Sequence, residues 1–286
     1  MSHENKFCLY MPPLSTISCY KEMVDFAAAH GIRQLETLNL LDLSTPDLEV
    51  AKELKAYADS KGITFPCVSV GIDLADKDYE TGVETLKGYA QVAKILGSPY
   101  LHHTIALNFS EPQKIADNFD LFYNRGITAV REVFDYAQPL GIRTIYEDQG
   151  FLFNGRANFT RFLKDVERNV GVVADFGNIQ FVDEDVEDFI PAFADRIAHV
   201  HVKDYLITPG TSREKLPEEY TSKGGNFLQD RLIDQGSVHI QKAFAALKAI
   251  GYNGAVAVET GPMGPDEEQS FRYNLETVNR YITAYL

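Results

Sequence analysis

The segment from Ile197 to Asp204, Ile-Ala-His-Val-His-Val-Lys-Asp, constrains the fold of this chain more than any other. Side chains alternate between the two faces of a strand, so His199, His201 and Lys203 would share one face while apolar residues occupy the other. A strand covered on both sides normally reads as a continuous apolar run. Two imidazoles and an ammonium on one face cost stability unless they bind something. A lone histidine is usually a hydrogen-bonded core residue, but this pattern indicates a functional site, and histidine is the commonest metal ligand.

The rest of the chain alternates short apolar segments with amphipathic ones, most of them ended by glycine or a turn. We expect strands at 6–11, 32–38, 64–70, 100–106, 143–147, 171–175, 197–203 and 255–259, and helices at 20–30, 47–61, 81–96, 111–137, 158–168, 184–194, 238–250 and 266–285. Strands that alternate with helices predict a parallel sheet. Eight such units in 286 residues predict a closed (β/α)8 TIM barrel. No Gly-x-Gly-x-x-Gly follows the first strand, which argues against a dinucleotide-binding sheet.

The composition fits a single domain spanning residues 1–286, with a long active-site loop at about 204–236, after the seventh strand. A net charge of −14 opposes binding to nucleic acid, and no apolar run is long enough to span a membrane. The polar N-terminus does not resemble a signal peptide, so we expect a cytoplasmic protein. Cys8, Cys19 and Cys67 show no CxxC spacing, so neither a disulfide framework nor a zinc knuckle is expected. The sequence is compatible with a homo-oligomer.

Polar side chains end four consecutive strands of the expected barrel. Glu147, Asp175, His201 and Glu259 each have the parity of an inward-facing residue, and barrel active sites lie at the carboxyl ends of the strands. Three carboxylates and an imidazole would repel strongly without a cation, so we expect one divalent metal ion. Three oxygen ligands and one nitrogen favour Mn²⁺, with Co²⁺, Mg²⁺ or Zn²⁺ as alternatives. Taken singly, Asp175 could instead cap the next helix, and Glu147 could pair with Arg143.

Further polar groups near the strand ends are candidates for substrate contact. His102 should point into the barrel from the fourth strand, unless it is a satisfied core histidine. Glu36, near the end of the second strand, could line a polar pocket or cap a helix. Lys203 could hold a substrate oxygen, act as an acid, or pair with one of the two acids that end the fifth strand. Ser222-Lys223-Gly224-Gly225 is a weak candidate for phosphate binding.

Three motifs carry a resemblance to a known family: Ala-His-Val-His-Val-Lys-Asp at 198–204, Val-Ala-Asp-Phe-Gly-Asn at 173–178, and Ala-Ile-Gly-Tyr-Asn-Gly at 249–254, which leads into Val-Ala-Val-Glu at 256–259. The chain resembles the xylose isomerase-like TIM barrels of the sugar phosphate isomerase/epimerase superfamily over nearly its full length. The resemblance implies that Glu147, Asp175, His201 and Glu259 bind the metal. It also implies that Glu147 and Glu259 are the catalytic groups, acting on opposite faces of the substrate carbon.

Two departures from the family pattern narrow the function. Asn178 stands where many members have a histidine, and Gln149 stands where several dehydratase-like members have one. Both leave neutral hydrogen-bonding groups, and we expect Asn178 to contact substrate. An endonuclease IV-like trinuclear zinc site needs a histidine at the Asn178 position and an Asp-x-His after the seventh strand, and neither is present.

The expected function is therefore that of a divalent-metal-dependent isomerase or epimerase. Its substrate would be a ketose or a related small keto-polyol, and the reaction would pass through an enediolate. The alternative is a metal-dependent dehydratase acting on an inosose-like or dehydroshikimate-like substrate. A barrel that only binds metal or sugar fits less well, because a binding protein has no use for two potential bases.

Overall fold

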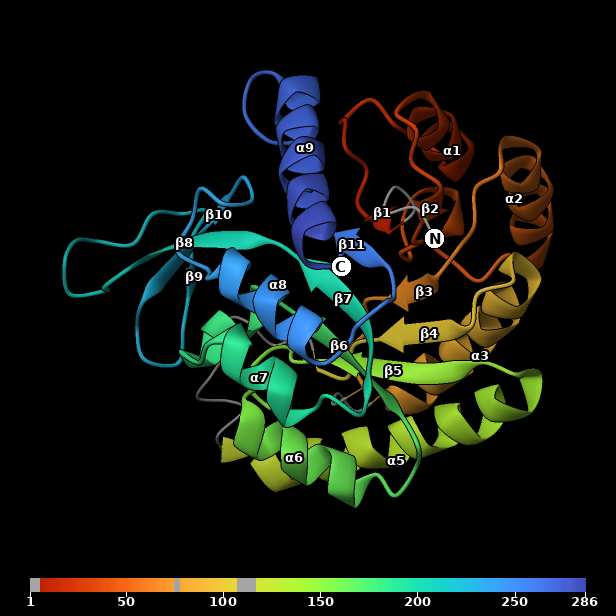
Figure 1. Cartoon of the computed structure of the whole chain (residues 1–286). Helices are drawn as coiled ribbons and strands as arrows, with labels where there is room; N and C mark the ends of the chain where they lie inside the picture. The colour runs from red at the N-terminus through yellow and green to blue at the C-terminus, as the bar shows by residue number, and fades with distance from the viewer. Residues whose placement is uncertain (1–5, 75–77, 107–116) are drawn as a thin grey trace.

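The structure, a computed structural model, describes residues 6–74, 78–106 and 117–286 (Figure 1). Its parallel strands are β1 (Phe7–Leu9), β2 (Gln34–Leu35), β3 (Cys67–Val70), β4 (Tyr100–His103), β5 (Arg143–Glu147), β6 (Gly171–Asp175), β7 (Ile197–Val202) and β11 (Val256–Val258). The helices are α1 (Tyr20–Ala29), α2 (Leu48–Lys61), α3 (Tyr79–Leu96), α5 (Phe119–Ala137), α6 (Arg156–Asp165), α7 (Val186–Ala192), α8 (Ile240–Ala249) and α9 (Glu267–Tyr285). Short 3-10 turns occupy η2 (Leu41–Leu43), η3 (Gln138–Leu140) and η4 (Asn178–Val182).

The parallel strands form one sheet that curves into a nearly closed barrel. The strand order is β2-β1-β11-β7-β6-β5-β4-β3. The two edge strands meet through isolated bridges between Gln34 and Thr64 and between Thr37 and Val68. Helices surround the strands in Figure 1. The predicted (β/α)8 TIM barrel is therefore confirmed.

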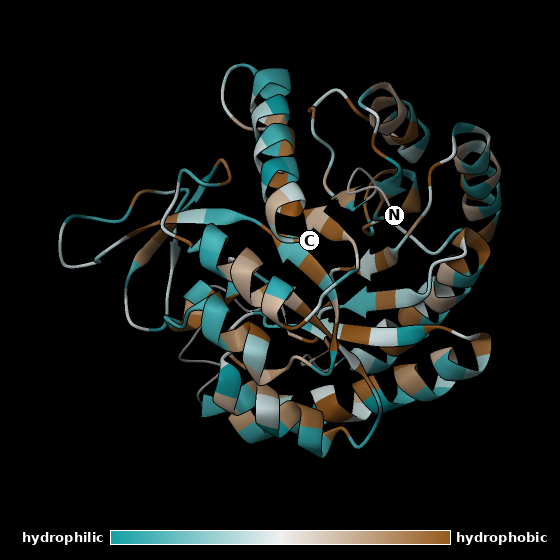
Figure 2. Cartoon of the chain, in the orientation of Figure 1, coloured by the Kyte–Doolittle hydropathy of each residue, from teal (hydrophilic) through white to brown (hydrophobic). Residues whose placement is uncertain are grey.

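Local sequence signals explain where several helices begin and end. The Asp47 carboxylate accepts hydrogen bonds from the backbone N–H groups of Glu49 (2.9 Å) and Val50 (3.0 Å), which caps α2. Gly62 and Gly97 end α2 and α3 with positive φ angles of 68° and 73°, a conformation that costs glycine little. Figure 2 shows hydrophobic and hydrophilic residues mixed along the helices, as expected for helices with one face on a core.

The main apolar core lies between the strands and the surrounding helices, while polar groups occupy much of the barrel interior. Val172 and Val200 belong to the main core and are fully buried. Cys67, Ile145 and Val173 form a separate small apolar cluster. The hydrophilic arrowhead of β4 in Figure 2 illustrates how polar residues enter the carboxyl ends of the strands.

The segment 204–236, predicted from the sequence to be a long active-site loop, has secondary structure of its own. It contains an antiparallel sheet of β8 (Asp204–Thr208), β10 (Phe227–Arg231) and β9 (Tyr220–Thr221), which projects from the barrel in Figure 1. The strands were not foreseen from the sequence because the glycines and charges of this segment lie mostly in its turns, whereas the paired strands bury Tyr205 and Leu228. Asp204 anchors the far end by accepting hydrogen bonds from the backbone N–H groups of Gly236 (2.8 Å) and Val238 (3.1 Å).

Other element bounds shift by a few residues from the predicted ones. Helix α5 begins at Phe119, and residues 111–116 of the predicted helix 111–137 lie outside the described residues. Strand β2 keeps only two residues of the predicted 32–38, because its contact with β3 consists of isolated bridges. Cys8, Cys19 and Cys67 are free thiols, as expected.

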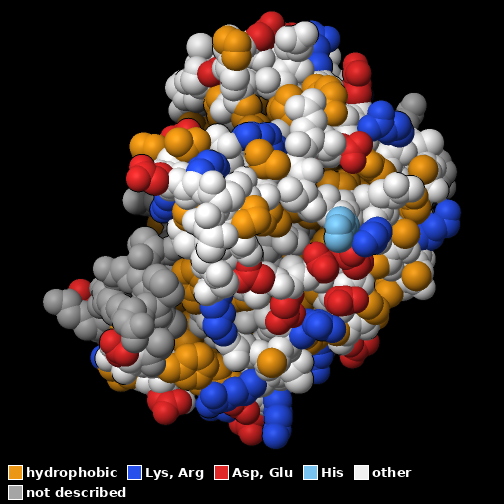
Figure 3. Space-filling model, turned by 90° about the vertical axis from the view of Figure 1, so that its left-hand side faces the viewer, with side chains coloured by type: hydrophobic (Ala, Val, Ile, Leu, Met, Phe, Trp, Pro, Cys, Tyr) orange, Lys and Arg blue, Asp and Glu red, His pale blue; other side chains and the backbone are white. Residues whose placement is uncertain are grey.

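The outer surface carries charges of both signs. Figure 3 shows acidic and basic side chains interspersed with small hydrophobic groups on one face of the molecule. Elsewhere in the structure, a surface ion pair joins Arg168 and Asp135 at 2.6 Å, although exposed pairs of this kind contribute little to stability. Among the residues that the structure describes, no helix combines the length and the hydropathy that crossing a membrane requires.

Candidate metal centre

Four side chains converge at the carboxyl ends of neighbouring strands. Glu147 ends β5, Asp175 ends β6, His201 lies on β7, and Glu259 directly follows β11. One ligand atom from each lies within 4.8 Å of the ligand atoms of the others. The strand register explains the convergence, since Asp175 and Ala257 are the partners of His201 on the two adjacent strands.

The atoms facing one another in this cluster are nearly all hydrogen-bond acceptors. Nδ1 of His201 lies 3.1 Å from a Glu147 oxygen, 3.5 Å from a Glu259 oxygen and 3.9 Å from Oδ2 of Asp175. The backbone N–H groups of Gly177 and Asn178 donate to Oδ1 of Asp175 at 2.8 and 2.7 Å. Asp175 thus caps the following turn with one oxygen, while its other oxygen is buried without a hydrogen bond from any described residue. This donor set fits a divalent cation with oxygen and nitrogen ligands.

Lys203 supplies the positive charge nearest to these carboxylates. Its Nζ lies 3.0 Å from Glu259 and 3.2 Å from Asp175, rather than beside the acids that end β5. Burial lowers the pKa of Lys203, but Asp175 and Glu259 outweigh burial and raise it well above its usual value. Gly177 makes room for this side chain, because a Cβ there would meet Cγ of Lys203 at 2.6 Å.

The two candidate catalytic glutamates have very different pKa values. Burial raises the pKa of Glu147, but the adjacent His102 and His201 outweigh burial and lower it to about 2. Burial raises the pKa of Glu259 to about 8, a shift that Lys203 opposes and Asp175 reinforces. The Glu259 side chain is also the most exposed of the four, at 25%. Without a cation, the cluster therefore holds one ionised and one readily protonated glutamate at neutral pH.

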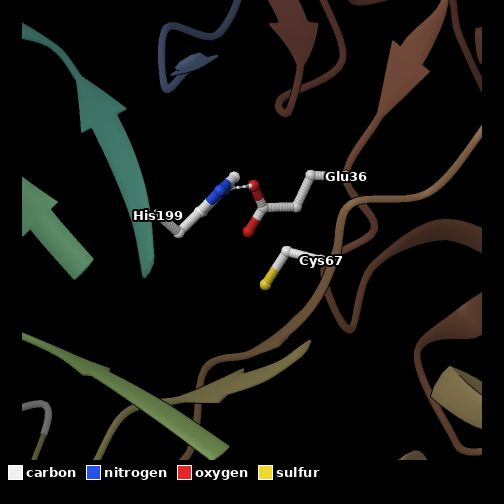
Figure 4. Close-up of side chains that lie close together, drawn as sticks. All are labelled: Glu36, Cys67 and His199. Atoms are coloured by element: carbon white, nitrogen blue, oxygen red, sulfur yellow. Dashed lines mark hydrogen bonds and ion pairs between the residues drawn. The ribbon is translucent and has the colours of Figure 1, made fainter. Parts of the chain in front are cut away.

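Glu36 lies inside the barrel, between two histidines of β7. It is fully buried, with one oxygen 2.6 Å from Nε2 of His199 and the other 3.1 Å from Nε2 of His201. The Ser69 hydroxyl also donates to Glu36. Figure 4 shows Glu36 and His199 pointing toward each other, with the Cys67 sulfur close by. The partners of the Glu36 carboxylate are thus side chains of the barrel interior.

His102 and Asn178 lie at the same end of the barrel. Nδ1 of His102 lies 2.9 Å from the Ser69 hydroxyl, and Nε2 lies 3.6 Å from Glu147 without a hydrogen-bond partner in the described part of the chain. The side-chain nitrogen of Asn178 is likewise buried and lacks a partner among the residues described. Both groups therefore keep hydrogen-bonding capacity that a bound molecule could use.

Two further residues contact the cluster and were not singled out from the sequence. Tyr10 of the first-strand region stacks on the His201 ring, with centroids 4.8 Å apart and planes at 27°. Asp148 accepts a hydrogen bond from the backbone N–H of Asp175 at 3.0 Å, and burial and the Asp175 charge raise its pKa well above the usual value. Strand parity shared with Cys8 could have indicated Tyr10, whereas the contact of Asp148 with the next strand needs the structure.

A cavity of about 390 Å³ opens beside the cluster. Lys203 and Glu259 line it on the barrel side, and Asp230 and Arg231 of β10 line it on the side of the small sheet; Asp204 and residues 260–264 complete the lining. The volume is within the range of small-molecule sites. Arg231 was not expected from the sequence, because only the antiparallel pairing of β10 brings it to the barrel mouth.

Residues 222–225, the candidate phosphate-binding segment, already bind a carboxylate of the same chain. The Asp183 carboxylate accepts hydrogen bonds from the Ser222 hydroxyl (2.6 Å), the Gly224 backbone N–H (2.6 Å) and the Asn226 side chain (2.8 Å). The donors of this weak phosphate candidate are therefore occupied by Asp183. The segment does form an anion-binding turn, but Asp183 fills it.

Comparison with known proteins places the fold and the family. Residues 24–281 match the family described as xylose isomerase-like TIM barrel. An inosose dehydratase of Geobacillus thermodenitrificans is 23% identical over 283 residues, covering 95% of this chain and 91% of that protein.

Solved structures agree on the fold. The protein named IOLI, with a bound zinc atom, superposes with a TM-score of 0.76 at 18% identity, covering 98% of this chain and 99% of that one. D-Psicose 3-epimerase of Clostridium cellulolyticum H10, in complex with D-tagatose, gives a TM-score of 0.72 at 20% identity, covering 97% of this chain and 99% of that one. The family match, which spans most of the chain, and the barrel with its buried candidate metal ligands lead to one conclusion. This chain belongs to the xylose isomerase-like TIM barrel family.

Proposed function

We propose that the protein is a divalent-metal-dependent isomerase or epimerase of a ketose or a related small keto-polyol. The observation that carries the proposal is the convergence of Glu147, Asp175, His201 and Glu259 beside a cavity of about 390 Å³. A divalent ion held by these residues would polarise the carbonyl and hydroxyl oxygens of the substrate and acidify the C–H group between them. Mn²⁺ is the favoured ion; the zinc atom of the structurally similar IOLI protein supports Zn²⁺ as an alternative.

Residues of the chain would carry out proton transfer and bind the substrate. Glu147 and Glu259 are the two carboxylates that can remove and return a carbon-bound proton. The Lys203 ammonium, at the edge of the cavity and 3.0 Å from Glu259, can donate a hydrogen bond to a substrate oxygen. Nε2 of His102 and the side-chain nitrogen of Asn178 offer further substrate contacts, since neither has a hydrogen-bond partner among the described residues.

A dehydratase of an inosose-like keto-polyol is the second candidate. The inosose dehydratase that is 23% identical over 95% of this chain favours it. The same residues would suffice, because removal of a proton next to a carbonyl also begins the loss of a β-hydroxyl. Lys203 would then stand beside the leaving oxygen.

One experiment separates the two reactions. The protein would be incubated with Mn²⁺ or Zn²⁺ and a panel of ketoses, keto-acids and inososes in ²H₂O, and the products would be followed by NMR and mass spectrometry. We expect solvent deuterium at the carbon next to the carbonyl of the product, without loss of water. Loss of one water from the product would establish the dehydratase instead. No reaction across the panel with any of the metals would contradict both.

A further inference from the structure

The hydrogen bonds around Glu36 fix which nitrogen of each neighbouring histidine carries a proton. An ionised carboxylate can only accept hydrogen bonds. One Glu36 oxygen lies 2.6 Å from Nε2 of His199; the other lies 3.1 Å from Nε2 of His201 and also contacts the Ser69 hydroxyl. Each of these three groups must therefore donate. His199 and His201 are accordingly protonated at Nε2.

The same count of hydrogen-bond donors and acceptors, applied to Ser69, fixes the proton on a third histidine. The Ser69 hydroxyl has one hydrogen, and that hydrogen is used on Glu36. Nδ1 of His102, 2.9 Å from the Ser69 oxygen, must then be the donor of that contact. A neutral His102 therefore carries its proton on Nδ1. Its Nε2, buried and 3.6 Å from Glu147, presents a lone pair to the site.

We propose that Glu36 is a positioning residue whose carboxylate sets the tautomers of His201, directly, and of His102, through Ser69. Because Glu36 holds the Nε2–H of His201, Nδ1 is the nitrogen that a metal ion would take, in place of its present 3.1 Å hydrogen bond to Glu147. Nε2 of His102 is left as an acceptor for a substrate hydroxyl. The metal part of this inference rests on the proposed function. A carboxylate that accepts the second N–H of a metal-binding histidine orients the ring and raises its basicity.

A second metal site is the competing interpretation of the same cluster. Ligand atoms of Glu36, Cys67 and His199 lie within 4.8 Å of one another, and all three residues are buried (Figure 4). A metal ion there would have to displace the hydrogen bonds that occupy both Glu36 oxygens. The existing contacts therefore favour the positioning role, and Cys67 provides a way to test the alternative.

The first test measures metal binding in three variants, by competition with a chelator and by elemental analysis. Glu36→Gln replaces one acceptor oxygen with a donor NH₂ group, so we expect affinity for Mn²⁺ or Zn²⁺ to fall by about 10- to 100-fold. Ser69→Ala cuts only the path to His102, so its affinity should stay at the wild-type value. Cys67→Ser is the matched control in the same cluster and should leave both affinity and stoichiometry unchanged.

Two results would overturn the inference. One is wild-type metal affinity in a folded Glu36→Gln protein. The other is a stoichiometry of two ions per chain that drops to one in Cys67→Ser, since Glu36 would then be a ligand of a second ion.

A second test reads the tautomers themselves and does not depend on a metal. Two-bond ¹⁵N–¹H correlation spectra of histidine-labelled protein at neutral pH should show His102 protonated at Nδ1, with the signals assigned by their absence in His102→Gln. Ser69→Ala should move a measurable fraction of that proton to Nε2, even if Glu36→Gln fails to fold. His102 protonated at Nε2 in the wild type would contradict the inference. Failure of the wild type to bind any metal would contradict the proposed function alone.

Discussion

Lys203, which directly follows β7, and His201 on that strand approach the same two carboxylates. Nζ of Lys203 lies 3.2 Å from Asp175 and 3.0 Å from Glu259, while Nδ1 of His201 lies 3.9 and 3.5 Å from them. The lysine therefore competes with any ion at the centre for carboxylate oxygens. One ammonium and one divalent ion also balance the three negative charges of Glu147, Asp175 and Glu259.

Replacing the lysine should separate ion binding from turnover. We expect Lys203→Met to bind Mn²⁺ at least as tightly as the wild type, because the competing ammonium is gone. Turnover should fall by about 10²-fold, the typical effect of removing a group that assists proton transfer or holds a reacting oxygen. Titration calorimetry and initial rates measure the two effects. Weaker ion binding in a folded Lys203→Met protein would contradict the competition.

Asp175 and Asp148 form a matched pair of buried acids for testing the metal centre. Asp175→Asn keeps an oxygen for the two backbone N–H groups but places NH₂ where Oδ2 faces Lys203 and the other ligands, so we expect ion affinity to fall by more than about 100-fold. Asp148→Asn should leave ion affinity nearly unchanged, because Asp148 bonds the backbone N–H of Asp175 and is not one of the four grouped ligand residues. Elemental analysis after dialysis compares them. Equal ion content in the two variants would argue against the assigned ligand set.

Glu259 is the candidate base that borders the cavity. Glu259→Gln preserves the shape of the side chain but cannot accept a carbon-bound proton, so we expect the rate to fall by about 10²-fold or more. Solvent deuterium incorporation into the product should fall in parallel. A variant that retains the wild-type rate would remove Glu259 from proton transfer and leave it as a ligand at most.

We expect the buried His103 to lower the free energy of unfolding at acidic pH, independently of the candidate metal centre. Burial lowers its pKa to about 3, and its ring nitrogens contact the Thr104 carbonyl and the Tyr146 hydroxyl, each at 2.9 Å. In the unfolded chain the pKa is about 6.5. Below that pH the unfolded state takes up a proton that the folded state does not, so His103 costs about 1.4 kcal/mol of stability for each pH unit between 6.5 and 3.

The variant His103→Gln lacks this titration. The difference in free energy of unfolding between the wild type and His103→Gln should therefore become smaller as pH falls from 7 to 4.5. Urea unfolding at several pH values measures it. A difference that stays constant over this range would show that His103 titrates normally in the folded protein.

The small antiparallel sheet should respond to substrate. Asp230 and Arg231 of β10 line the same cavity as Lys203 and Glu259, so a bound substrate would contact both the sheet and the barrel. We expect substrate to slow proteolysis and amide exchange across 204–236, and Arg231→Ala to raise KM more than it lowers kcat. Unchanged exchange at saturating substrate would show that the sheet is not a lid.

The convergence of the four candidate ligands could be predicted because it depends on local information. Strand parity and the rule that barrel sites lie at strand ends need only residues within each strand, so Glu147, Asp175, His201 and Glu259 could be grouped in advance. The barrel itself could be predicted for the same reason, since each βα unit carries its own pattern.

Contacts across the barrel could not be predicted in this way. Glu36 follows β2 and His199 lies on β7, two strands that are not neighbours in the sheet, so no pattern within either strand indicates their hydrogen bond. The anion-binding turn at Ser222 was recognised in the sequence, but its occupant, Asp183, lies 39 residues earlier. The strands of the 204–236 segment were missed because their short apolar alternation is masked by charged and glycine-rich turns.

The position of β11 links the metal centre to the folding of the whole barrel. This strand joins β1 to β7 by pairing Phe7 with Val256 on one side and His201 with Ala257 on the other. Glu259 leaves it with its backbone N–H bonded to the Val202 carbonyl at 3.0 Å. Until this last strand inserts between the two, Glu259 is not held beside the other three side chains. An ion that binds all four ligands would therefore also stabilise the pairing of β11 with β1 and β7.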